Sequence, residues 1–176
     1  MLKLSFPKKV KFICGFIYKD EKIYEKVKKI MQKKFGAIDY ESKTINFNFT
    51  DYYKKEMGSN LWRNFVSFKK LKNIEEFIKI KLYCIKLEKK FSQNNKRCIN
   101  IDPGYLNEAK LVLLSTKDFY HRIYLGKGIF CELTLYYANK NFQDLAWTYP
   151  DYRTPSYKSI FLEIRNIYRN QIKGEK

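Results

Sequence analysis

The chain has 176 residues and a formal charge of +18, because 36 Lys and Arg residues stand against 18 Asp and Glu residues. No segment approaches the roughly 20 apolar residues that a membrane span needs, and the N-terminus lacks the apolar run of a signal peptide. The four cysteines form no C-x-x-C pair and have apolar neighbours, as in a reducing compartment. The composition therefore predicts one soluble, cytoplasmic domain over residues 1–176 with a substantial core.

The positive charge suggests a polyanionic partner, since Lys and Arg neutralise phosphates and release counterions. Only six of the 36 basic residues are arginine, the residue best suited to bidentate phosphate and base contacts. A chain rich in Lys, Ile, Asn and Tyr also follows from AT-rich codons without selection for binding. The charge therefore leaves two interpretations open, a nucleic-acid or nucleotide site and a solvated lysine surface.

The first third of the chain predicts a strand, a helix and two further strands. Residues 11–18 are apolar on both faces, which is typical of a central strand. Asp20 precedes a helical apolar period that runs to Phe35. Residues 42–49 alternate between apolar and polar as in a half-buried strand, and residues 63–69 form another strand.

A second helix and a short strand complete the first half. Asn73 and Glu76 have the spacing of a capping box ahead of a helix that runs to about Phe91. Residues 98–101 then read as a short strand. The order β-α-β-β-α-β is that of the ferredoxin-like fold, with two helices on one face of an antiparallel sheet.

The second half predicts a three-stranded meander over residues 109–115, 119–125 and 129–137, and an irregular segment over 138–153. Thr154 and Pro155 then open a last helix. The fold class is therefore α+β. We expect an antiparallel sheet with helices mainly on one face, and a ferredoxin-like first half extended by a β-meander and a C-terminal helix.

The hairpin around residues 126–128 tests which side chains share a face, because paired residues on antiparallel strands point the same way. A three-residue loop places one mostly apolar set together, made of Leu125 with Ile129, Ile123 with Cys131 and His121 with Leu133. The opposite face then pairs Tyr124 with Phe130, Arg122 with Glu132 and Tyr120 with Thr134. This register predicts that His121 is a hydrogen-bonded core residue. Arg122 and Glu132 form either a cross-strand ion pair or an anion-binding arginine oriented by a carboxylate.

Acidic residues provide the candidates for catalysis. Asp102 opens an Asp-Pro-Gly tripeptide that predicts a type II turn at a strand end. Glu56 lies in a short helical turn over residues 50–58, capped by Thr50 or Asp51, and has no evident structural role. Together with Glu132 and Asp151, these carboxylates would form a cluster for Mg²⁺ or for acid–base chemistry.

The segment from Trp147 to Tyr152 places aromatic rings and Asp151 ahead of the last helix, as in loops that stack bases and in loops that fasten a helix to a sheet. Established motifs are absent. Residues 36–44 lack the second glycine of a phosphate-binding loop, and Asp118 comes one residue too early for a guanine-specificity motif. One His and scattered Cys residues exclude zinc-type spacing.

Several short motifs together carry a resemblance. These are Thr50-Asp51-Tyr52-Tyr53, Glu56-Met57-Gly58, Asn100-Ile101-Asp102-Pro103-Gly104-Tyr105, Ser115-Thr116-Lys117, His121-Arg122-Ile123-Tyr124 and Trp147-Thr148-Tyr149-Pro150-Asp151-Tyr152. Over essentially the whole chain the sequence resembles a prokaryotic family, the domain of unknown function 4416 family. Some of its members carry an automatic "GTP-binding protein" label. The resemblance implies a family and no chemistry.

The sequence thus predicts an RNA- or nucleotide-binding domain with a basic, aromatic-lined face. The expected ligand-binding residues are Tyr105, Lys117, Arg122, Trp147, Asp151 and Tyr152. One alternative is a metal-dependent hydrolase or transferase that acts on a phosphorylated substrate through Glu56, Asp102 and Glu132. Mg²⁺ would be its cofactor, although spacing assigns no metal ligand. The other alternative is a non-catalytic interaction or structural subunit, so the sequence leaves open whether the chain is an enzyme.

Overall fold

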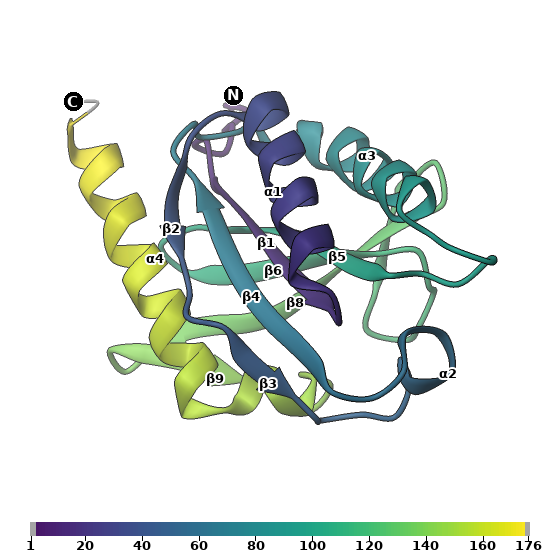
Figure 1. Cartoon of the computed structure of the whole chain (residues 1–176). Coiled ribbons are helices and arrows are strands. Elements are labelled where there is room, and N and C mark those ends of the chain that lie inside the picture. The colour runs from purple at the N-terminus through teal and green to yellow at the C-terminus, as the bar shows by residue number, and fades with distance from the viewer. Residues whose placement is uncertain (1–2, 175–176) are drawn as a thin grey trace.

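A computed structural model describes residues 3–174 and contains a nine-stranded sheet, helices on both of its faces and two 3₁₀ turns (Figure 1). The strands are β1 (Lys11–Tyr18), β2 (Ile38–Glu41), β3 (Ile45–Phe47), β4 (Leu61–Phe68), β5 (Ile99–Leu106), β6 (Lys110–Ser115), β7 (Ile123–Gly126), β8 (Ile129–Ala138) and β9 (Asn141–Asp144). The helices are α1 (Glu21–Phe35), α2 (Lys54–Met57), α3 (Phe77–Lys90) and α4 (Pro155–Gly174), with 3₁₀ turns η1 (Ile74–Glu76) and η2 (Pro150–Arg153). The α+β fold class is confirmed.

The sheet is open and its pairings are antiparallel, in the order β2-β4-β1-β5-β6-β8-β7. The short strand β3 pairs with β4, and β9 pairs with β8. All eight residues of β1 are buried, which fits its place near the middle of the sheet and its apolar character on both faces. The prediction of a central strand at residues 11–18 is therefore confirmed.

Two apolar cores lie on opposite faces of the sheet. Phe12, Cys14 and Phe16 of β1 point into the first core, which α1 and α3 cover (Figure 1). Ile13 of β1 and Phe65 of β4 point into the second core, which α4 covers. The expectation of helices mainly on one face thus holds for α1 and α3, whereas α4 packs against the other face.

Three of the helix starts predicted from capping residues are confirmed. The Asp20 side chain accepts a hydrogen bond from the backbone N–H of Lys22 at 2.8 Å. Asn73 and Glu76 form the capping box at the start of η1, which continues into α3. The Thr154 hydroxyl lies at the start of α4 and accepts from the N–H of Tyr157 at 3.4 Å.

The segment around residues 38–58 differs from its prediction. Instead of one strand over 42–49, the chain forms β2 and β3, separated by a break at which the buried Ser42 hydroxyl accepts from the N–H of Phe65 at 2.9 Å. Helix α2 begins after Tyr53 and has no side-chain cap, because the Thr50 hydroxyl accepts from the N–H of Tyr52 instead. Local alternation could not reveal this break, since it depends on a contact with β4.

The predicted meander in the second half is wrong. Strand β8 lies between β6 and β7, so the chain crosses over rather than running to the adjacent strand. β7 begins only at Ile123, and Gly126 rather than Leu125 pairs with Ile129 because of a bulge. The pairs of Ile123 with Cys131 and of Tyr124 with Phe130 are confirmed. The segment expected to be irregular contains β9 and η2.

The Asp102-Pro103-Gly104 tripeptide is not a turn, because it lies inside β5. β5 pairs with β6 only through residues 104–106, and α3 satisfies the free edge before them. Glu88 accepts from the N–H of Ile101 at 2.6 Å, and Lys81 donates to its carbonyl at 3.3 Å. The backbone nitrogen of Pro103 faces the same unpaired edge of β5 as that of Ile101. The missing N–H of Pro103 therefore removes no hydrogen bond between strands.

β5 and β6 are therefore paired at residues 104–106 and separate at the residues of β5 that precede Gly104. At Gly104 itself the backbones meet closely, since a Cβ there would lie 2.4 Å from the carbonyl oxygen of Val112. In the part of the chain that the structure describes, no helix is both long and apolar enough to cross a membrane.

Candidate functional site

A cavity of about 460 Å³ opens where β5 and β6 separate. Five cationic side chains contribute to its wall, Arg63, Lys81, Arg97, Lys117 and Arg122. Four carboxylates do so as well, Glu88, Asp102, Glu132 and Asp151. Aromatic rings complete the wall, namely Phe47, Phe49, Tyr52, Tyr53, Tyr149 and Tyr152. The cavity thus combines charged groups of both signs with aromatic surface.

Arg63 of β4 is the most deeply buried charge of this wall, with 1% of its surface exposed. Its Nη1 donates to Asp102 Oδ2 at 3.0 Å, and its Nη2 donates to the Tyr152 hydroxyl at 2.9 Å and lies 3.4 Å from Asp151 Oδ2. Burial opposes the charge of Arg63, but Tyr152 and the two carboxylates outweigh it, so the pKa of Arg63 lies well above its ordinary value. Burial also raises the pKa of Asp151, and Arg63 only partly offsets this.

Gly15 explains how Arg63 reaches Asp102 across the intervening strand. Gly15 of β1 pairs with Phe65 on one side and with Asp102 on the other. A Cβ at this position would lie 3.0 Å from the Phe65 ring and 3.4 Å from Arg63 Cζ. The missing side chain therefore leaves the space in which the guanidinium lies over β1.

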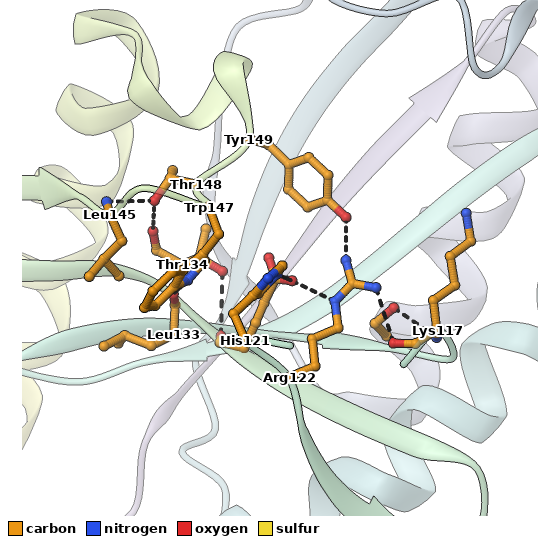
Figure 2. A network of polar contacts seen from close by, with 11 residues as sticks. Lys117, His121, Arg122, Leu133, Thr134, Leu145, Trp147, Thr148 and Tyr149 are labelled. Atoms are coloured by element: carbon orange, nitrogen blue, oxygen red, sulfur yellow. Dashed lines mark hydrogen bonds and ion pairs between the residues drawn. The ribbon is translucent and has the colours of Figure 1, made fainter. Parts of the chain in front are cut away.

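Glu132 of β8 holds a second polar network (Figure 2). Its Oε2 accepts from Arg122 Nε at 2.8 Å and contacts His121 Nε2 at 3.1 Å. Arg122 also donates to the Lys117 carbonyl at 3.0 Å and to the Tyr149 hydroxyl at 2.6 Å, so Figure 2 shows its guanidinium between the two. Glu132 Oε1 is buried and has no hydrogen-bond partner among residues 3–174.

The predicted separation of His121 from Arg122 and Glu132 is wrong, because both basic side chains share the Glu132 carboxylate. The prediction extended strand alternation back to residue 119. Residues 119–122 instead form a turn closed by the Arg122 N–H and the Phe119 carbonyl at 2.9 Å. A turn has no two-residue alternation, so consecutive side chains point to the same side here.

Trp147 fixes the position of His121 and does not line the cavity. The two rings stack with centroids 5.5 Å apart and planes 9° apart. The Trp147 indole N–H donates to the Leu133 carbonyl at 2.8 Å (Figure 2). Trp147 thus fastens its loop to β8. This is the structural role that the sequence offered for the segment as the alternative to base stacking.

Lys117 and Tyr52 lie at the mouth of the cavity, where both are exposed. The Lys117 ammonium donates to the Tyr52 hydroxyl at 2.6 Å and lies 4.0 Å from the centre of that ring. This hydrogen bond lowers the pKa of Tyr52 below its ordinary value. The ammonium is therefore held at the entrance, next to an aromatic face.

Arg97 connects Glu56 to the cavity. Arg97 forms an ion pair with Glu56, and its Nη1 donates to Asn100 Oδ1 at 2.9 Å. The Asn100 side chain lines the cavity, and its Nδ2 is buried without a hydrogen-bond partner in the described part of the chain. Glu56 itself does not line the cavity, and it has a structural role that the sequence did not reveal.

The structure brings together six of the nine predicted site residues. Lys117, Asp102, Arg122, Glu132, Asp151 and Tyr152 all line the cavity. Glu56, Tyr105 and Trp147 do not, and the Tyr105 ring packs against Phe77 at 5.2 Å on the α3 side of the sheet. The predicted carboxylate cluster is not formed, since Arg97, Arg63 and Arg122 pair with these acids separately. Within residues 3–174, no three His, Cys, Asp or Glu side chains are arranged to hold a metal ion.

Most other residues of the wall were not predicted, among them Arg63, Asn100, Tyr52 and Tyr149. Arg63 had a usable signal, since it is a lone cation in a strand whose other residues are mostly apolar. A buried arginine there requires a carboxylate partner from a neighbouring strand. Asn100 and Tyr149 lie in segments that the sequence singled out, but nothing there marks them ahead of their neighbours, because both reach the cavity through long-range packing.

The fold and site define an α+β protein with a cavity where two strands of its sheet separate. The chain belongs to the family described as Domain of unknown function (DUF4416), whose model matches residues 8–168. No curated protein and no solved structure matches the chain.

Proposed function

We propose that the cavity binds a nucleotide. The observation that carries this proposal is the composition of its wall, which places aromatic rings beside cationic side chains in a hollow of about 460 Å³. Sites for small ligands typically have volumes of about 300–1,000 Å³ and combine apolar walls with a few placed polar groups. Nucleotides need both kinds of surface, because they carry a flat base and charged phosphates.

The base has its binding surface near the mouth. Tyr52 and Tyr149 are 54% and 45% exposed, so their rings are accessible to a ligand. Tyr149 is held in place by the hydrogen bond from Arg122. Stacking on such rings tolerates different bases, since every base has a π face.

The phosphate and the polar edges have partners as well. The Lys117 ammonium has two N–H groups besides the one it donates to Tyr52, and it stands at the entrance, where a phosphate would remain partly solvated. Deeper in the cavity, Asn100 Nδ2 is a donor and Glu132 Oε1 an acceptor that lack partners within the described residues. Buried polar atoms normally have a hydrogen-bond partner, so these two atoms support a ligand that carries both acceptors and donors.

The carboxylates favour binding over metal-dependent hydrolysis. Asp102 and Asp151 are both committed to Arg63, and one oxygen of Glu132 is shared by His121 and Arg122. A Mg²⁺ site needs oxygen ligands that converge on one point. The arginine pairings do not support such a site in the cavity.

We also propose that the first half is ferredoxin-like and that the protein is cytoplasmic. The strand order β2-β4-β1-β5 and the placement of α1 and α3 on one face support the fold assignment. Four cysteines without a disulfide support a reducing compartment.

The test is calorimetric titration of the four ribonucleoside triphosphates, with and without Mg²⁺. We expect saturable binding of at least one of them and a loss of about tenfold or more in Lys117→Ala, since a charge-assisted hydrogen bond contributes roughly 1.5–3 kcal/mol. Lys140→Ala is the matched control, because this exposed lysine lies in the β8–β9 turn outside the cavity. Equal losses in both variants would show nonspecific attraction to a basic surface and would contradict the proposal.

A further inference from the structure

The wall of the cavity continues onto an aromatic strip of the sheet surface. Ser115 of β6 lines the cavity and pairs with Phe130 of β8, and Phe130 pairs with Tyr124 of β7. Paired residues of antiparallel strands point to the same face. Phe130 is also two residues from Glu132, which lines the cavity. Ser115, Phe130 and Tyr124 therefore form one row on the face of the cavity, and this row is called the strip below.

The strip is accessible and ordered. Tyr124 is 59% exposed and Phe130 is partly exposed, with ring centroids 5.1 Å apart and planes inclined by 54°. The Tyr124 hydroxyl accepts from the backbone N–H of Gly128 at 3.3 Å, which orients the ring. The row crosses two strand spacings, or about 10 Å, from the cavity to the end strand of the sheet.

The charges around the strip suit an anionic backbone. Lys117 follows Ser115 by two residues at the cavity mouth, and Lys127 lies in the hairpin that joins the two strands carrying the rings. Both lysines are exposed, and Asp118 is the acidic residue in the loop beside Lys117. The chain as a whole carries +18. Aromatic rings next to a positively charged groove are the arrangement that binds single strands without strong sequence preference.

We propose that the ligand of this site is a single-stranded nucleic acid rather than a free nucleotide. One nucleotide occupies the cavity, and the base next to it stacks on Tyr124 and Phe130. The inference rests on the proposed function, because it assigns the cavity to one nucleotide of a longer strand. The aromatic surface at the end of the sheet then binds a base. The neighbouring lysines would hold the phosphates that join the two nucleotides.

The experiment measures fluorescence anisotropy of labelled ten-nucleotide oligo-uridine and oligo-thymidine, with unlabelled uridine monophosphate as the competitor. We expect the oligonucleotides to bind at least tenfold more tightly than the mononucleotide. Tyr124→Ala should weaken oligonucleotide binding by about tenfold, as expected for the loss of one stacked base, and leave mononucleotide binding unchanged. Tyr124→Phe keeps the ring and should retain binding even though it loses the hydroxyl. Tighter binding of oligo-uridine assigns the site to RNA, and equal binding assigns it to either single strand.

Ile123→Ala is the matched control, because Ile123 is the preceding residue of the same strand, is 68% exposed and points to the opposite face. If Tyr124→Ala and Ile123→Ala have the same effect, the strip does not contact the ligand and the inference is overturned. Mononucleotide binding with no gain for the oligonucleotides also overturns it while leaving the nucleotide cavity intact. Absence of binding by every probe overturns both.

Discussion

Removal of the Arg63 guanidinium is the sharpest test of how the cavity is held together. Arg63→Met keeps a long apolar stem but deletes the ion pairs with Asp102 and Asp151 and the hydrogen bond to the Tyr152 hydroxyl. The Asp102 side chain is 26% exposed and would gain water, whereas the Asp151 side chain is 8% exposed and would remain buried without a cation. Breaking a buried pair from one side costs about 3–5 kcal/mol, and we expect that loss in the free energy of unfolding.

Urea-induced unfolding followed by tryptophan fluorescence at pH 7 measures this loss. Arg169→Met is the matched control, since Arg169 is 42% exposed and lies 4.0 Å from Glu108. We expect this control to lose no more than about 1 kcal/mol, as is usual for exposed ion pairs. A loss below about 1 kcal/mol in Arg63→Met would refute the assignment of Arg63 as the charge that holds the carboxylates in place.

The pH dependence of the same variant gives an independent check. Burial already raises the pKa of Asp151, and Arg63 opposes that rise, so removing Arg63 should raise this pKa further. A carboxyl group whose folded pKa exceeds its unfolded value stabilises the fold below the unfolded pKa, and that stability is lost as pH rises through the folded pKa. Arg63→Met should therefore be most destabilised near neutral pH and less so in mild acid. In Arg63→Met with Asp151→Asn this pH dependence should disappear and part of the stability should return.

Two further substitutions test the separation of β5 from β6 and the attachment of the aromatic loop. Gly104→Ala should cost about 3 kcal/mol in unfolding free energy, because its Cβ would lie 2.4 Å from the backbone oxygen of Val112 and neither strand can yield easily. A thermal midpoint equal to that of the unsubstituted protein would contradict this. Trp147→Phe should cost about 1–3 kcal/mol by leaving the Leu133 carbonyl without its indole N–H donor. Unchanged stability on urea titration would mean that solvent replaces this contact.

Patterns within a single element predicted structure well. Helix α1 followed from its apolar period and from Asp20, and the start of α3 followed from Asn73 and Glu76. These signals involve residues within one or two turns of each other, so tertiary packing has little opportunity to override them. The central strand at Lys11–Tyr18 followed from its continuous apolar character for the same reason.

Features that depend on a neighbouring strand could not be predicted in this way. Pro103 and Gly104 have strong turn preferences, yet β5 continues through them because α3 satisfies its free edge and Val112 requires a glycine. His121 was misplaced because the start of β7 is set by pairing with β8. Arg63 was missed because its partners are 39 and 88 residues away in the sequence.

The aromatic and charged segments 115–122 and 147–152 were identified as candidates from composition, and six of the nine predicted residues meet in one cavity. What composition could not supply was the reason that they meet, which is the separation of β5 from β6. The carboxylates were predicted to act together, but three different arginines pair with them: Arg63 with Asp102 and Asp151, Arg97 with Glu56 and Arg122 with Glu132. A single sequence shows which charges exist and not how they pair.

The most direct test of a nucleotide site in this cavity is a crystal structure of the protein with the tightest-binding nucleotide from the titration. We expect a base against Tyr52 or Tyr149, a phosphate beside Lys117, and ligand atoms within hydrogen-bond distance of Asn100 Nδ2 or Glu132 Oε1. A nucleotide held by the exposed lysines of α1 and α3, with the cavity unoccupied, would contradict this expectation.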